Sequence, residues 1–183
     1  MTEVINVNSN SKRKTIIIAA STVVKNNGVE KLTLDAVAKE AGVSKGGLLH
    51  HFPNKEALIT GMVEELTNDF FTTLQDRAMS ATVEKGKWSR AFTEVMSEDS
   101  MEGGEISTAL TAALFTNPDI LQKFQNQYAM WQQNIENDGI DPVVSTIVRL
   151  AADGLWYSEM FGLGVLDDEL RAKVIRKLIN MTE

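Results

Sequence analysis

Apolar residues recur along the chain at spacings of three and four, the period of a helix with one buried face. The first such run covers 12–27, and longer runs follow over 55–81, 117–137 and 141–161. No segment alternates convincingly between apolar and polar residues, as a half-buried strand does. The pattern therefore predicts an all-α protein with about nine helices.

Proline and capping residues mark where several of these helices begin. All three prolines of the chain fall at predicted boundaries. Asn117 and Asp141 each precede a proline, the residue favoured at the first helical position. Asp167 is placed to cap the last helix. Two further helices are expected over 88–101 and 105–115.

The segment 41–52 has the features of a helix-turn-helix. Gly42 ends one short helix, where the backbone needs a positive φ, and Ser44 can cap a second helix that starts at Lys45. The second helix is small and polar on its outer face, as a helix must be to lie against base edges in a major groove. An ordinary helical hairpin in a bundle would show the same bare Ala-x-x-x-Gly pattern.

Charge is distributed unevenly along the chain, whose net charge is −7. Residues 1–60 hold eight Lys and Arg against five Asp and Glu, which gives +3. Residues 61–183 hold ten against twenty, which gives −10. This asymmetry favours a basic head that faces DNA on an acidic body. A solvated charge imbalance without function would look the same.

The first third of the chain resembles the TetR family of bacterial transcriptional regulators. The matching residues are Ile16-Ile17-x-Ala19-Ala20, Gly28, Thr33, Val37-Ala38-x-x-Ala41-Gly42-Val43-Ser44-x-Gly46-x-Leu48 and His51-Phe52-x-x-Lys55-Glu56-x-Leu58. The remainder matches only as an all-helical domain of suitable length. Family members often carry Tyr at position 49 or 50, where this chain has Leu49 and His50.

The resemblance implies two domains. A three-helix DNA-binding domain would cover 1–56, and a helical effector-binding and dimerisation domain would cover 57–183. Residues 1–11 are polar and are expected to form a disordered arm. The implied function is that of a cytoplasmic regulator, a repressor that binds a palindromic DNA operator as a homodimer and is released by a small apolar or amphipathic effector. The alternative is a small-molecule binding protein or enzyme with a vestigial helix-turn-helix head.

The expected DNA contacts come from the second helix of the helix-turn-helix and from its basic and hydroxyl-bearing flanks. Phosphate contacts supply affinity, whereas contacts to base edges supply sequence preference. The residues of the second helix expected at the DNA are Lys45, Gly46, Gly47, His50 and His51. Those expected at phosphates are Arg13, Lys14, Thr33, Ser44 and Lys55.

Large adaptable apolar residues gather in the second part of the chain. Aromatic and Met stripes at helical spacing usually form ordinary core. Together with the resemblance, they indicate a mostly apolar cavity with a few polar groups, suited to a lipophilic or amphipathic molecule. The residues expected to line it are Phe92, Met96, Phe124, Tyr128, Trp131 and Trp156.

The last two helices carry more apolar residues than one inward face requires. In the resembled family these helices pair with their copies as a four-helix bundle. The residues expected at this dimer interface are Ile147, Ala151, Leu155, Leu170, Val174 and Leu178.

The chemistry of an enzyme is weakly represented. The chain has no Cys, which excludes disulfides and thiolate metal sites and suits a reducing cytoplasm. The only two His are adjacent, so on a helix they point about 100° apart and cannot share a metal without other ligands. The carboxylates between Glu94 and Glu105 are expected to form a solvated face, with a site for a cationic effector or catalysis as alternatives. No cofactor, metal or membrane span is expected.

Overall fold

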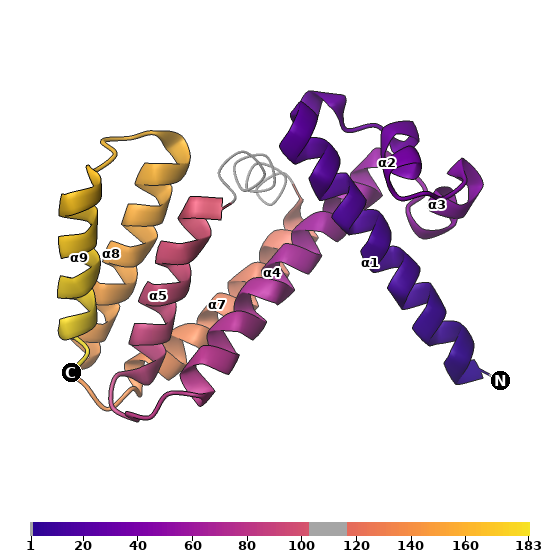
Figure 1. Cartoon of the computed structure of the whole chain (residues 1–183). Helices are drawn as coiled ribbons and strands as arrows, with labels where there is room; N and C mark the ends of the chain where they lie inside the picture. Colours follow the sequence, from indigo (N-terminus) through magenta and orange to yellow (C-terminus); the bar gives the residue numbers. More distant parts are fainter. Residues whose placement is uncertain (1, 103–116) are drawn as a thin grey trace. The chain divides into compact units, whose positions relative to one another are not determined.

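The secondary structure is helical, as the sequence predicts, and Figure 1 shows no strand in the part of the chain described here. The computed structural model describes residues 2–102 and 117–183, with side chains at 11–98 and 117–183. The helix expected over 105–115 lies outside the described residues.

The described residues divide into two compact units. The first, called the head, contains residues 2–66 and 117–120. The second, called the body, contains residues 67–102 and 121–183. Each unit has buried apolar side chains of its own.

The head is built from short helices packed on a long one. Its elements are α1 (Thr2–Asn27), the 3-10 helix η1 (Val29–Lys31), α2 (Leu34–Glu40), α3 (Lys45–His51) and the start of α4 (Lys55–Met79). α1 packs on α2 and η1, and α2 packs on α3. Gly42 connects α2 to α3 with φ 64°, the positive value that the sequence predicts there. The helix-turn-helix is therefore confirmed.

The N-terminal arm is not an arm in the structure, because α1 begins at Thr2 instead of about Lys12. No Gly or Pro interrupts the ten residues before Lys12. Extending an existing helix adds one hydrogen bond for each residue fixed, so its propagation through polar residues costs little. The prediction of a disordered arm from polar composition alone was therefore wrong for residues 2–11.

The body is a bundle of long helices. It contains the rest of α4, α5 (Lys87–Glu102), most of α7 (Pro118–Glu136), α8 (Pro142–Phe161) and α9 (Asp168–Asn180). α5, α8 and α9 lie side by side, each in contact with the other two (Figure 1). Asp141 accepts the N–H of Val143, and Asp167 accepts the N–H of Leu170. Both predicted caps are therefore confirmed.

The start of α5 is fixed by residues far away in the sequence. The carboxylate of Asp138 accepts the N–H groups of Trp88 and Ser89 over 3.0 and 2.8 Å. Gly86 has φ 70°, and a Cβ atom there would lie 2.0 Å from the carbonyl oxygen of Thr182. The α4–α5 loop therefore depends on close contacts with the loop after α7 and with the end of α9.

Candidate nucleic-acid interface and effector site

The outer face of α3 is open and carries polar residues, glycines and one exposed apolar side chain, Leu49. Lys45, Gly46, Gly47 and His50 are exposed, whereas Leu48 is fully buried. A Cβ atom on Gly46 would meet no atom within 4 Å, so the protein itself leaves room there. Glycine on such a face lets a partner approach the helix backbone closely. These exposed residues are among those that the sequence analysis expects at the DNA.

Thr33 and Ser44 cap α2 and α3 from exposed positions. The Thr33 hydroxyl accepts the N–H of Ala36, and the Ser44 hydroxyl accepts the N–H of Gly47, each over 3.1 Å. A hydroxyl that accepts one bond can still donate its proton to another acceptor. Both residues can therefore contact a phosphate while they keep the short helices in place.

Lys45 pairs with a carboxylate of the neighbouring helix. Its Nζ lies 3.0 Å from Oδ1 and 3.0 Å from Oδ2 of Asp35, which is in the first turn of α2. Both side chains are more than half exposed, at 58% and 71%. Lys55 is also exposed, and no ion pair holds it within the described part of the chain. Among the described residues, Lys45 is therefore held by an ion pair and Lys55 is not.

Arg13 and Lys14 connect α1 to α4. Arg13 Nη2 lies 3.5 Å from Glu64 Oε2, and its guanidinium lies 5.2 Å from the centroid of the Phe52 ring. Lys14 Nζ lies 3.0 Å from Glu65 Oε1. These pairs are partly exposed, and exposed ion pairs contribute about 0–1 kcal/mol, so a phosphate can compete for either cation.

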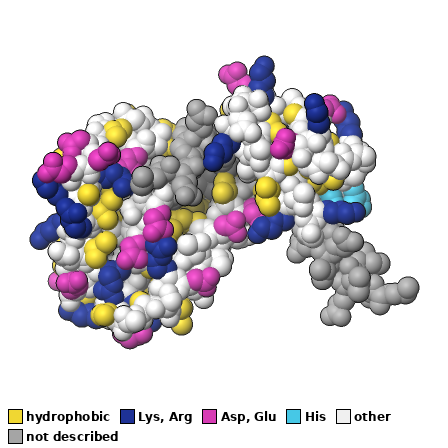
Figure 2. Space-filling view, in the orientation of Figure 1, with side chains coloured by type: hydrophobic (Ala, Val, Ile, Leu, Met, Phe, Trp, Pro, Cys, Tyr) yellow, Lys and Arg dark blue, Asp and Glu magenta, His cyan; other side chains and the backbone are white. Residues whose placement is uncertain are grey.

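His50 and His51 lie next to Lys and Arg side chains, as the cyan and dark blue atoms of Figure 2 show. Their ring centroids are 5.3 Å apart with the rings edge to face. Partial burial above all, and then the charges of His50, Lys12 and Arg13, hold the pKa of His51 below its ordinary value of 6.5. His50 is exposed and His51 only partly so, which makes His50 the better placed of the two to contact DNA.

The residues expected to bind an effector gather in the core of the body. Five of the six belong to one hydrophobic cluster or pack against it: Phe92, Met96, Tyr128, Trp131 and Trp156. The sixth, Phe124, has its ring 5.0 Å from that of Tyr128. The sequence analysis does not single out Phe71 of α4. Its ring lies about 6 Å from the rings of Phe124, Tyr128 and Trp131.

A polar triad lies in this aromatic surrounding, and the sequence analysis missed two of its members. Tyr128 donates its hydroxyl proton to Oδ1 of Asp153 over 2.8 Å, and Arg149 Nη1 lies 2.6 Å from Oδ2. Burial raises the pKa of Asp153, although the bonds from Tyr128 and Arg149 oppose the shift. Arg149 and Asp153 are one helical turn apart on α8, a spacing that any solvated pair would also show.

Two buried donors near these side chains lack acceptors. Trp131 Nε1 and Arg149 Nε have no hydrogen-bond partner among the described residues, and Trp131 is only 6% exposed. A buried donor without an acceptor costs about 1–3 kcal/mol. The core therefore offers two N–H groups that an incoming molecule could satisfy.

The residues expected at the dimer interface differ in exposure. Ile147 and Leu170 are 49% and 46% exposed, whereas Ala151, Leu155 and Val174 are partly buried. Leu178 is only 6% exposed and lies in the core of its own chain, so it offers little surface to a partner. A helix apolar on two sides does not reveal from spacing alone which side faces inward.

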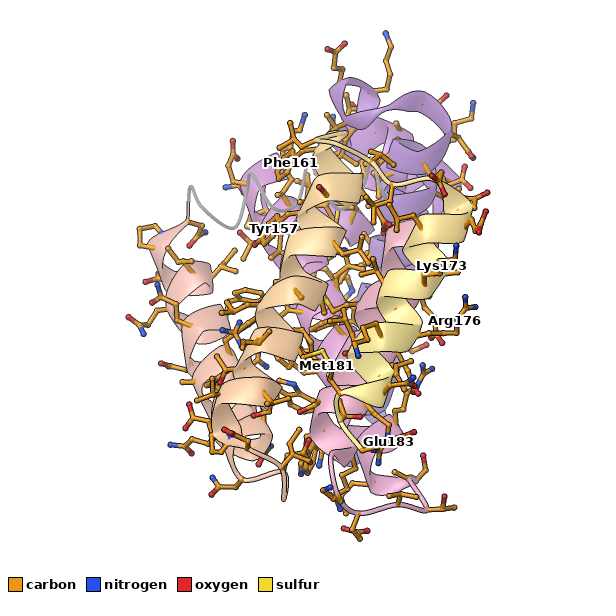
Figure 3. All side chains as sticks on the ribbon, turned by 90° about the vertical axis from the view of Figure 1, so that its left-hand side faces the viewer. Tyr157, Phe161, Lys173, Arg176, Met181 and Glu183 are labelled. Carbon is orange, nitrogen blue, oxygen red and sulfur yellow. The ribbon has the colours of Figure 1, made fainter. Side chains whose placement is uncertain are left out.

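The exposed apolar side chains of α8 form a row on one face at helical spacing. This row, called the α8 apolar row, consists of Val143, Ile147, Leu150, Tyr157 and Phe161. Figure 3 shows Tyr157 and Phe161 on the same side of α8, and their rings are parallel with centroids 6.2 Å apart. Leu163 and Val165 in the following loop are exposed as well.

The acidic cluster is, where it is described, part of a surface ion-pair network. Arg77 Nη1 lies 2.7 Å from Glu98 and 3.7 Å from Glu94. The other predicted members of the cluster lie outside the described side chains. A pocket of about 340 Å³ adjoins Arg77 and Glu94, and its lining includes none of the six expected effector residues.

Metal-binding clusters and membrane-spanning helices are absent from the described ranges 2–102 and 117–183. No group of three or more His, Asp and Glu could hold a metal ion there. No helix in those ranges is long and apolar enough to cross a membrane.

Comparisons with known proteins match both parts of the chain. Residues 86–183 match the family described as "Tetracyclin repressor-like, C-terminal domain". Residues 16–62 match the family described as "Bacterial regulatory proteins, tetR family". Over 67 residues the chain is 36% identical to the HTH-type transcriptional repressor KstR2 of Mycolicibacterium smegmatis, covering 37% of this chain and 31% of that protein. The chain spans about a third of the length of the curated relatives that it matches.

Solved structures share the fold over nearly the whole chain. A transcriptional regulator from Rhodococcus sp. Rha1 is 19% identical with a TM-score of 0.70, covering 93% of this chain and 95% of that one. The multidrug binding protein EbrR, solved with malachite green, is 23% identical with a TM-score of 0.56, covering 91% and 97%. At these identities the likeness shows the fold alone.

Proposed function

Because this chain belongs to the TetR family, and is thus a transcription regulator and not an enzyme, we propose that it is a cytoplasmic repressor. It binds a palindromic operator as a homodimer and is released from it by a small amphipathic effector. The observation that carries this proposal is the outer face of α3, which exposes Lys45, two glycines, Leu49 and His50 and is backed by a buried Leu48.

The proposed reading of DNA follows from that face. Lys45 and His50 can donate to base acceptors in the major groove, and Gly46 and Gly47 allow the helix backbone to come close. Lys55 and the hydroxyls of the two caps would contact phosphates, which add affinity without sequence preference. The predicted DNA-binding range 1–56 lies within the head, whose described residues extend to 66 and include 117–120.

A dimer is proposed because one head covers too little duplex for tight specific binding. The α8 apolar row offers a contiguous apolar face, and exposed Leu170 on α9 lies on the next helix. Such a face on a monomer usually marks an interface. In a twofold dimer, each row would pack against its copy, together with the exposed part of α9.

The proposed effector enters the aromatic core of the body. Trp131 Nε1 and Arg149 Nε need acceptors, so the effector carries at least one acceptor group on an otherwise apolar frame. EbrR was solved in complex with malachite green, an aromatic dye, which supports a body of this fold that accepts an aromatic molecule. The effector would favour the conformer whose two heads are wrongly spaced for DNA, by at most its difference in affinity for the two conformers.

A ligand screen tests this proposal directly. The protein is bound to a duplex selected from a random pool, and compounds are scored for release and for a change in tryptophan fluorescence. A releasing compound should bind Trp131→Phe at least about tenfold more weakly, since the lost donor leaves the ligand's acceptor unsatisfied. Trp88→Phe controls for the loss of ring volume in the same cluster, because Trp88 packs 5.2 Å from the Trp131 ring but its N–H is not among the buried donors without a partner. Equal affinity for all three proteins would place the effector elsewhere.

A further inference from the structure

The ion pair between Asp35 and Lys45 links the two helices of the helix-turn-helix on their exposed side. Asp35 lies in the first turn of α2, and Lys45 is the first residue of α3. Both carboxylate oxygens lie 3.0 Å from the same Nζ. The pair is 58% and 71% exposed, so it contributes little to folding. Its position on the face proposed to meet DNA calls for another role.

An unrestricted lysine contacts bases less selectively than a lysine held in one position. Its ammonium group sits on a flexible four-carbon stem and can reach several acceptors, phosphate oxygens included. A carboxylate at a fixed place on α2 narrows the set of positions that Nζ adopts. The same carboxylate also repels the phosphate backbone, which lowers affinity for every duplex. Asp35 therefore favours one position of the Lys45 ammonium group but disfavours the binding of DNA as a whole.

We propose that Asp35 is a positioning residue that sets the base preference of Lys45 at the expense of general DNA affinity. The inference rests on the proposed contact of Lys45 with a base. Replacing Asp35 should tighten binding to all duplexes and relax the preference at one base pair in each half-site. The relaxation is expected to be about two- to fivefold, the range that one exposed ion pair supplies.

A double-mutant cycle tests the coupling. Wild type, Asp35→Asn, Lys45→Ala and the double variant are titrated with the selected duplex and with duplexes changed at each position in turn. Asp35→Asn should reduce discrimination at the position that Lys45→Ala also affects. In the Lys45→Ala background, Asp35→Asn should leave discrimination unchanged at every position, although affinity still rises.

Glu40→Gln supplies the matched control. Glu40 is an exposed acid on the same helix, with no ion pair to Lys45. Its removal should raise affinity for all duplexes without changing the preference. Circular dichroism and thermal unfolding of each variant check that the head stays folded.

The possible outcomes separate the inference from the proposed function. If Lys45→Ala changes no preference, the contact of Lys45 with a base is wrong and the inference falls with it. If Lys45→Ala changes a preference that Asp35→Asn leaves intact, the function stands and the positioning role is refuted. A loss of discrimination in the double variant beyond that of Lys45→Ala alone would also refute it, since Asp35 would then act independently.

Discussion

The hydroxyl of Tyr128 donates to a carboxylate oxygen of Asp153 over 2.8 Å, and Tyr128 itself packs against the hydrophobic cluster of the body. The second oxygen of Asp153 pairs with Arg149 over 2.6 Å. Burial of two charges is costly, and a well-packed apolar set in their place is often as stable or more so. The triad therefore suits ligand recognition better than it suits stability.

The stability of the body should depend on the titration of Asp153. Burial raises the pKa of Asp153 in the folded protein above its ordinary value of 3.8, so the folded state binds the proton more tightly than the unfolded state. The contribution of Asp153 to stability should fall as pH rises from about the ordinary value through the raised one. Urea unfolding of wild type and Asp153→Asn over a pH series measures this. The unfolding free energy of wild type minus that of Asp153→Asn should fall as pH rises in that window, and a rise in this signed difference would contradict the assignment.

Gly86→Ala should destabilise the body strongly. The new Cβ would lie 2.0 Å from the carbonyl oxygen of Thr182, and φ is 70°. Overpacking and positive-φ strain together should cost about 3 kcal/mol or more. Gly139→Ala is the control, because φ there is 74° but the nearest atom lies 3.7 Å away. It should cost about 1–2 kcal/mol. Equal losses in thermal or urea unfolding would show that the contact with Thr182 is unimportant.

A charge in the α8 apolar row should separate the proposed dimer. Ile147→Glu and Leu150→Glu each place a carboxylate near its own copy, and like charges across an interface cost several kcal/mol. Dimerisation should weaken by at least about a hundredfold while the helical signal is retained. Met130→Glu is the control, because Met130 is a 62% exposed apolar residue of α7 outside the α8 apolar row. It should leave the mass of the proposed dimer unchanged. Light scattering at micromolar concentration distinguishes these outcomes, and intact dimers of both α8 variants would move the interface elsewhere.

Lys55→Ala and Lys45→Ala should differ in what they change. Lys55 is proposed to contact phosphate, so its loss should weaken binding to specific and random duplexes alike and reduce the salt slope by about one unit. Lys45→Ala should change the preferred base at one position in each half-site. Titrations at several salt concentrations measure both effects. Equal losses of affinity for specific and random DNA in both variants would refute the proposed contact of Lys45 with a base in the major groove.

The parts of the fold that the sequence predicted well are local. The caps Ser44, Asp141 and Asp167 each accept an N–H group two or three residues further along the chain. Gly42 adopts the positive φ that its position requires. Such features depend on a few neighbouring residues and can be recognised in a sequence without a structure.

The parts that the sequence did not predict depend on distant contacts. Asp138 caps a helix whose first residue is about fifty positions earlier, and spacing gives no sign of that. Arg149 and Asp153 resemble any solvated pair on a helix until Tyr128 is seen to complete the triad. Leu178, predicted at the dimer interface, is buried in its own chain, and spacing alone did not separate it from the exposed Leu170 on the same helix. The effector, interface and DNA contacts themselves stay predictions.

The most direct test of the account is the selection of bound fragments from a pool of random duplex DNA by the wild-type protein, followed by sequencing. A dimer that reads one major groove with each α3 predicts a twofold-symmetric motif, with half-sites about 10 base pairs apart or slightly more. The motif should change at one position per half-site when selection is repeated with Lys45→Ala. Enrichment of a single unrepeated half-site would contradict the dimer, and no enrichment at all would contradict the proposal that this chain reads DNA.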